Sequence, residues 1–149
     1  MTKFGIYEKY LNELKRDLKV ISIVGRHKSG RSYIMNRFFG TRFNVSDTRY
    51  TDGIWMSIVE IHDGGKSQLF ILLDCEGLLS AQRNEQEEIK LCLALSAISD
   101  IMILNLDNYF DEHLNRISKC FSKSIGRIRG KQLFRGKLMM LVRDISKID

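Results

Sequence analysis

Residues 20–36 read VISIVGRHKSGRSYIMN, and this stretch decides the fold class. The first five residues are mostly apolar and β-branched, which is typical of a buried strand. A helix is predicted from Arg31 to Phe39, and Gly25 and Gly30 bound the loop between strand and helix. The loop fits the pattern G-x-x-x-x-G-K-S/T at every fixed position except one, where Arg31 replaces the lysine. The sequence therefore predicts a phosphate-binding loop.

The chemistry of a bound anion explains the spacing of this loop. Two glycines let the backbone fold around a phosphate, and the loop N–H groups converge on it together with the helix N-terminus. Ser32 supplies a hydroxyl ligand for Mg²⁺. The alternative is an ordinary turn between a strand and a helix that binds nothing. The predicted phosphate-binding residues are Gly25, Arg26, His27, Lys28, Ser29, Gly30, Arg31 and Ser32.

The rest of the chain alternates between predicted strands and helices. Asp63-Gly64-Gly65 suits a hairpin turn, and 40–52 is a long polar loop. This alternation predicts an α/β fold with a mostly parallel sheet covered on both faces. Strands are predicted at Ile54–Ile61, Gln68–Leu73, Ile101–Leu104 and Lys137–Val142, and helices at Tyr7–Leu18, Glu85–Ser99 and Phe110–Ile125, the last with Asn108 as its N-cap.

Three short motifs follow the predicted loop. Thr51–Trp55 fits T-x-G-I-W, Asp74–Gly77 fits D-x-E-G at the end of a strand, and Arg143–Asp144 ends the last strand. Each motif alone is weak, because a lone threonine is usually solvated, D-x-E-G is a common turn and an Arg-Asp pair is often a surface ion pair. Their order and spacing behind a phosphate loop give them weight together.

Taken together, these motifs resemble the GTP-binding domain of guanylate-binding proteins and atlastins. That family has the phosphate loop followed by M-N or L-N, which Met35-Asn36 matches, and then T-x-G-I-W, D-x-E-G and R-D. The resemblance runs from about Val20 to Asp144. It implies a P-loop NTPase fold of the Ras-like G domain type, with one antiparallel hairpin strand, and GTP or GDP with Mg²⁺ as ligands.

The resemblance also implies a role for each matched residue. Thr51 would close onto Mg²⁺ and the γ-phosphate, Asp74 would bind Mg²⁺ through water, and the Gly77 amide would sense the γ-phosphate. Ser32, Thr51 and Asp74 are thus the expected metal-site residues. Asp144 would accept the two ring-edge donors of guanine, and Arg143 would help to frame the base.

Two basic residues of the loop depart from the family pattern. Guanylate-binding proteins carry a catalytic arginine at the fourth loop position, where this chain has Lys28, and a lysine where it has Arg31. Arginine is longer and forked, so Arg31 is expected to crowd the γ-phosphate. Lys28, Arg31 and Thr51 are the candidate catalytic residues. Slow hydrolysis of GTP is expected, and the alternative is a module that binds GTP without turnover.

The chain of 149 residues is expected to be one G domain that lacks the elements following the guanine motif in Ras-like folds. Relatives dimerise across the nucleotide face, so a homodimer or heterodimer is expected. Without a signal peptide or a long apolar run, a cytoplasmic protein with no transmembrane segment is expected.

Charge raises a competing hypothesis. The net charge is +6, and residues 113–143 hold nine Lys and Arg and no acid. Such a stretch is typical of a nucleic-acid surface or of an ordinary solvated face. Only two aromatic residues, Phe121 and Phe134, lie among these charges, which is too few for a base-stacking surface, so no nucleic-acid partner is expected.

Overall fold

The computed structural model describes residues 18–26, 28–45, 53–75, 77, 84–107, 115, 118–119, 122–123 and 136–143. Helical backbone is also found at residues 115, 118, 119, 122 and 123, inside the helix predicted at 110–125. The rest of that helix, Asn108 and the predicted helical residues 7–17 lie outside the described residues. The main elements are β1 (Leu18–Gly25), α2 (Arg31–Phe39), β2 (Ile54–Asp63), β3 (Lys66–Cys75), α3 (Glu85–Ile98), β4 (Ile101–Asp107) and β5 (Lys137–Arg143).

These strands form a single mixed sheet in the order β2-β3-β1-β4-β5. β1 pairs in parallel with β3 and with β4, β4 pairs in parallel with β5, and β2 alone runs antiparallel to its neighbour β3. The predicted fold class, an α/β G domain with a mostly parallel sheet and one antiparallel hairpin strand, is confirmed. Central β1 therefore has a parallel neighbour on each side.

The hairpin between β2 and β3 forms where the glycine pair predicts it. Gly64 and Gly65 have φ angles of 52° and 79°, in the left-handed region that costs glycine little. Two successive positive φ angles are what a type I′ turn requires, and this turn matches the twist of the flanking strands. The first pair closed by the turn is Asp63 opposite Lys66.

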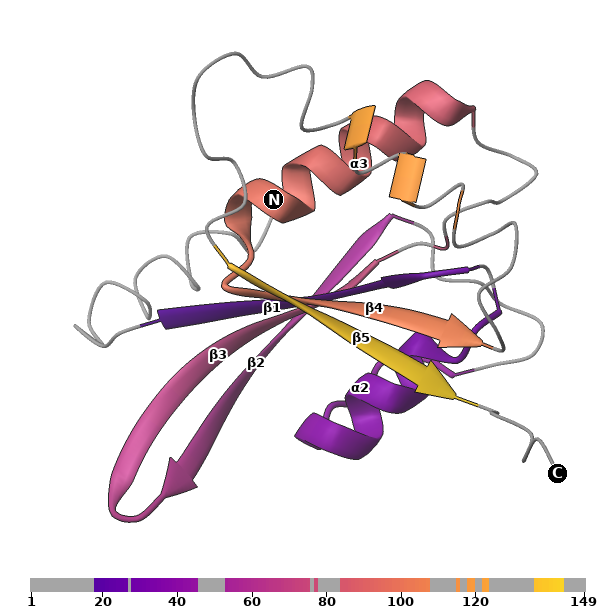
Figure 1. The fold of residues 1–149 in the computed structure, drawn as a ribbon. Coiled ribbons are helices and arrows are strands. Elements are labelled where there is room, and N and C mark those ends of the chain that lie inside the picture. The colour runs from indigo at the N-terminus through magenta and orange to yellow at the C-terminus, as the bar shows by residue number, and fades with distance from the viewer. Residues whose placement is uncertain are drawn as a thin grey trace, which may run out of the picture.

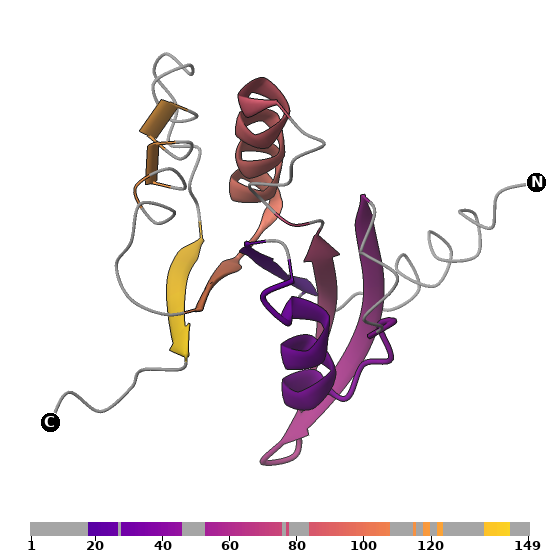
Figure 2. The ribbon, with the colours of Figure 1, turned by 90° about the vertical axis from the view of Figure 1, so that its right-hand side faces the viewer.

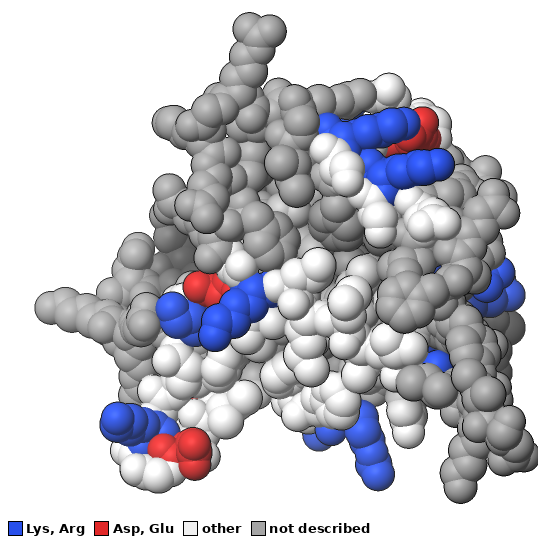
Figure 3. Space-filling view, in the orientation of Figure 1, with Lys and Arg blue, Asp and Glu red and all other residues white. Residues whose placement is uncertain are grey.

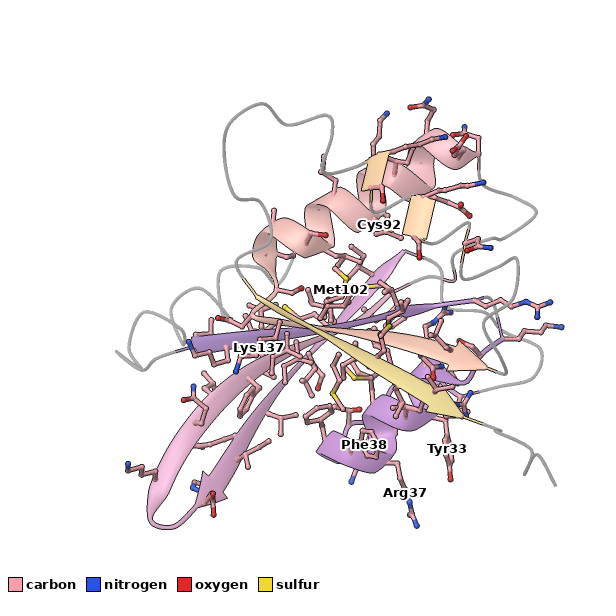
Figure 4. All side chains as sticks on the ribbon, viewed as in Figure 1. Tyr33, Arg37, Phe38, Cys92, Met102 and Lys137 are labelled. Carbon is pink, nitrogen blue, oxygen red and sulfur yellow. The ribbon has the colours of Figure 1, made fainter. Side chains whose placement is uncertain are left out.

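The two helices cover opposite faces of the sheet (Figures 1 and 2). α2 packs Ile34 and Met35 against alternate residues of the central strands, such as Ile23. On the other face, α3 packs its own apolar side against the intervening residues; Figure 4 shows Cys92 of α3 and Met102 of β4 within this layer. The continuous apolar sequence of the central strands is thus explained, because both of their faces are buried.

Leu18 departs from the sequence prediction, which made it the last residue of a first helix. It begins β1 and pairs with Leu69 of β3, because an apolar side chain at a helical spacing can equally belong to a buried strand. The other boundaries differ by a few residues. β4 is longer than predicted and continues through Asn105 to Asp107.

β5 lies at the edge of the described sheet. Leu138, Met139 and Met140 are between 47% and 56% exposed, although all three are apolar. The start of β5 is held by the Lys137 N–H, which donates to the Asp100 carbonyl at 2.8 Å. Gly136 permits this contact, because a Cβ there would lie 2.3 Å from the Ser99 carbonyl oxygen.

Candidate functional site

The phosphate loop, residues Gly25–Ser32, follows the carboxyl end of β1. In the sheet, β1 has β3 on one side and β4 on the other. After β1 the chain goes first to the β3 side of the sheet and later crosses to the β4 side. Open α/β sheets bind ligands at such a point, because the connections on the two sides leave a crevice at the strand ends. The motif found in the sequence therefore occupies the position that this topology favours for a ligand.

The backbone of the phosphate loop suits an anion. Lys28 and Gly30 both have positive φ, 62° and 73°, and lie on either side of Ser29. Alternation with left-handed residues makes successive N–H groups converge into an anion-binding concavity. Gly30 is the N-cap of α2, and no side chain caps this end, whereas Asn84 and Glu87 form a capping box at the start of α3. The N-terminus of α2, which has no side-chain cap, suits a bound phosphate.

Gly25 is required by close packing. A Cβ at this position would lie 2.5 Å from the Asn105 carbonyl oxygen and 3.1 Å from the Ser29 hydroxyl. The nearer of these two atoms belongs to the backbone, which cannot move away as a flexible side chain can. The first glycine of the motif thus lets β4 and the returning loop approach β1.

Arg31 fits inside the phosphate loop. Its side chain is buried, with only 6% of the residue exposed, and one guanidinium nitrogen donates to the carbonyls of Gly25 at 2.6 Å and Arg26 at 3.1 Å. The arginine is therefore held by the loop's own backbone. Lys28, by contrast, is exposed. The two basic residues of the loop are thus in different surroundings, one buried within it and the other at its surface.

Ser32 and Asp74 come together across 42 residues of sequence. The Ser32 hydroxyl donates to Asp74 Oδ2 at 2.6 Å, and the Asp74 carboxylate is buried at the end of β3. Hydroxyl and carboxylate oxygens are the hard donors that Mg²⁺ prefers, and this pair therefore fits that ion. Among the described residues, no group of three or more His, Cys, Asp or Glu is arranged so that it could hold a metal ion. A site of one or two protein ligands completed by phosphates and water suits Mg²⁺.

Asn105 is a site residue that the sequence analysis missed. It is fully buried, and its side-chain amide donates to the Ser29 carbonyl at 2.7 Å and to the Ser29 hydroxyl at 3.1 Å. The same side chain accepts a hydrogen bond from Arg143 Nε at 3.1 Å, and a second Arg143 nitrogen donates to the Ser29 carbonyl. A polar residue within the apolar run 101–106 was the available signal, since a buried amide needs partners.

Asn36, the asparagine of the M-N motif, fixes the start of the following loop. The side-chain oxygen Oδ1 of Asn36 accepts from the Thr41 hydroxyl at 2.7 Å and from the Phe43 N–H at 2.8 Å. The side-chain NH₂ group donates to the Phe43 carbonyl at 2.9 Å. Figure 4 shows the neighbouring Arg37 on the outer side of α2, directed away from the sheet. Asn36 therefore anchors the segment that leads toward residues 46–52.

Three predicted site residues, His27, Thr51 and Asp144, lie outside the described residues. Their roles stay predictions from the resemblance. Gly77 is described and buried, two residues beyond the end of β3. The phosphate loop, Asp74, Gly77 and Arg143 all follow or end strands that run in parallel, so they belong to the same edge of the sheet.

Trp55 provides a reporter beside the predicted metal site. It pairs directly with Asp74 across the antiparallel β2–β3 ladder, and opposite residues of such a pair project from the same face. Trp55 is 56% exposed, so its indole is within reach of water and of any group that closes over it.

We expect a non-hydrolysable GTP analogue to change the emission of Trp55 more than GDP does. The reason is that Thr51, four residues away in sequence, would close onto the γ-phosphate, as the resemblance implies. Because Trp55 is the only tryptophan, the Trp55→Phe protein gives the matched blank. Identical spectra with GDP and the analogue would contradict this prediction.

Basic residues are scattered on the face shown in Figure 3. Lys and Arg appear there in several separate places, and acidic side chains lie beside some of them. Lys123, within the acid-free stretch, pairs with Glu85 of α3. The part of this face that the structure describes therefore offers no continuous basic stripe. Among the described helices, none is long and apolar enough to cross a membrane.

The sheet order and the phosphate loop together define a G-domain fold of the P-loop class. The sequence matches the guanylate-binding protein, N-terminal domain family over residues 3–145, and the chain belongs to this family of large GTPases. It is 30% identical over 141 residues to the protein SEY1 homolog of Dictyostelium discoideum, covering 86% of this chain and 16% of that relative.

Two further relatives match most of this chain but only a small part of their own length. Protein sey1 of Schizosaccharomyces japonicus is 26% identical over 145 residues, covering 90% of this chain and 18% of the relative. Guanylate-binding protein 5 of Mus musculus is 31% identical over 109 residues, covering 70% of this chain and 18% of the relative. The chain thus spans less than a fifth of the length of these relatives, and the matched region corresponds to a G domain.

Proposed function

We propose that this chain binds GTP and GDP with Mg²⁺ and hydrolyses GTP slowly. The observation that carries the proposal is the uncapped N-terminus of α2 behind a loop with two left-handed residues, beside the hydrogen-bonded oxygens of Ser32 and Asp74. Membership of a large-GTPase family supports guanine as the base. Of the three hypotheses raised by the sequence, the two that bind GTP use all of these features, and the nucleic-acid hypothesis uses none of them.

Each group at the site has a distinct task in this proposal. The N–H groups of the phosphate loop and of α2 bind the phosphate oxygens, and Arg31 adds a positive charge within the loop. Ser32 and Asp74 would hold Mg²⁺, which neutralises charge on the phosphates when bound. Base selection is assigned to Asp144, whose carboxylate would accept from the guanine ring edge.

The metal assignment predicts a specific loss in the Ser32→Ala variant. We expect its affinity for GTP in the presence of Mg²⁺ to fall by about tenfold or more, since a ligand and a hydrogen bond to a charged group are lost. In the presence of a chelator, the variant and the parent chain should bind GTP equally. Titrations with GTP, GDP and ATP, with and without Mg²⁺, measure both effects.

Ser57→Ala, on β2 away from the phosphate loop, is the matched control and should bind GTP like the parent chain. Equal affinity of the parent chain for GTP with and without Mg²⁺ would remove Ser32 and Asp74 from a metal site. Binding of ATP as tight as that of GTP would instead remove guanine selectivity from the proposal.

The alternative of a module that binds GTP without turnover is separated by a single-turnover measurement. Retention of all bound GTP over hours would favour that alternative, whereas slow release of phosphate favours hydrolysis. Pairing across the nucleotide face, which the resemblance implies, predicts a nucleotide-dependent doubling of mass in light scattering. An unchanged mass with the GTP analogue would argue against such pairing in this chain.

A further inference from the structure

Arg143 reaches from the end of β5 to the phosphate loop. The sequence resemblance gives this residue a role at the base, but its guanidinium donates to the Ser29 carbonyl and to Asn105 Oδ1. It also lies beside Gly30, because a Cβ there would be 3.7 Å from both terminal nitrogens of Arg143. The described contacts of this arginine are therefore with the loop and with Asn105.

The Ser29 carbonyl is held from two strands at once. Asn105 of β4 donates to it at 2.7 Å, and Arg143 of β5 donates to it as well. Arg143 can only donate, so the Asn105 oxygen must face it and the Asn105 NH₂ group must face Ser29. Both side chains thereby fix each other's orientation as well as that of the carbonyl.

Holding this carbonyl also sets the direction of a loop N–H group. The Ser29 carbonyl and the Gly30 N–H belong to one planar trans peptide, in which the two groups point in opposite directions. With the carbonyl directed toward Asn105 and Arg143, the Gly30 N–H points away from them. Gly30 is the N-cap of α2, so this N–H stands at the helix end that suits an anion.

We propose that Arg143 is a positioning residue for the phosphate loop. Together with Asn105, it locks the Ser29–Gly30 peptide in the orientation that presents the Gly30 N–H to the β-phosphate. Arg143 directly precedes Asp144, the residue assigned to guanine, so the same strand end links base recognition to phosphate binding. This inference rests on the proposed function for its ligand, but the locking of the loop concerns the protein alone.

The first test follows hydrogen exchange of the 26–32 backbone in the chain without nucleotide. We expect Arg143→Ala to speed exchange in this segment by about tenfold, the effect of losing a hydrogen bond to a charged donor. Arg143→Lys, which can reach one acceptor but lacks the fork, should have a smaller effect. Arg37→Ala, at an exposed position on α2, is the matched control. Unchanged exchange in Arg143→Ala would overturn the proposal.

The second test separates phosphate from base by comparing GDP, GMP and ADP. We expect Arg143→Ala to lower the GDP-over-GMP affinity ratio by about tenfold, because only GDP carries the β-phosphate. The GDP-over-ADP ratio should stay within about threefold, less than 1 kcal/mol. A fall confined to the GDP-over-ADP ratio would place Arg143 at the base and overturn the proposal.

Failure of the proposed function gives a different result from failure of this inference. If the parent chain binds no GDP, the proposed function is wrong, while faster exchange in Arg143→Ala would still support the locking of the loop. If Arg143→Ala does not fold, judged by its thermal unfolding, Arg143→Lys carries both tests. Parent-like exchange and parent-like GDP-over-GMP ratio in that variant would then overturn the role of the forked side chain.

Discussion

Exchanging the two basic residues of the phosphate loop, as Lys28→Arg with Arg31→Lys, should raise the rate of GTP hydrolysis by about 10³-fold. In the structure, the Arg31 guanidinium is engaged with the Gly25 and Arg26 carbonyls inside the loop. A lysine at that position is shorter and carries a compact charge, which leaves more room for the γ-phosphate. An arginine at position 28 would supply the planar donor that the resemblance implies for charge stabilisation in the transition state.

The two single changes are the controls for this exchange. Lys28→Arg alone should gain less than the double variant, because Arg31 still occupies the loop, and Arg31→Lys alone should improve binding of GTP more than turnover. Phosphate release under saturating GTP and Mg²⁺ measures all four proteins. Turnover of the parent chain at about 1 s⁻¹ or above, as in working enzymes, would contradict this prediction. It would show that Lys28 and Arg31 at their native positions do not slow hydrolysis.

The second large effect is expected on stability. Gly25→Ala should lower the free energy of unfolding by about 3 kcal/mol, the upper part of the range for overpacked sites. The added Cβ would meet the Asn105 carbonyl oxygen at 2.5 Å, so β1 and β4 must separate or the loop must shift. Because small domains are stable by about 5–15 kcal/mol, a loss of this size is readily measured by denaturant unfolding.

Gly40→Ala is the matched control for this stability prediction. Gly40 has a φ of 66°, yet a Cβ there would meet nothing within 4 Å. Its replacement therefore adds only backbone strain, of about 1–2 kcal/mol. If Gly25→Ala is no more destabilising than Gly40→Ala, then the close approach of β4 to the loop does not exclude a side chain at position 25.

Local sequence determined much of the fold. The strand, glycine-bounded loop and helix of residues 20–39 were predictable because β-branched residues, two glycines and helical spacing act over short distances. The pair Gly64-Gly65 predicted the hairpin for the same reason, since positive φ is a local property. The ambiguity at Leu18 arose because the helical spacing of Tyr7, Leu11, Leu14 and Leu18 does not reveal which of these residues a neighbouring strand will pair with.

Only the tertiary structure decided how distant polar residues meet at the site. The sequence placed Ser32 and Asp74 in separate motifs, and the parallel pairing of β1 with β3 brings them to 2.6 Å. Asn105 lay just beyond the predicted strand Ile101–Leu104, and β4 places its side chain against Ser29. Arg143 was assigned to the base by its motif, while its contacts with the loop depend on the position of β5 beside β4. Hydrogen bonds of this kind depend on strand register, which the residue pattern of one segment does not specify.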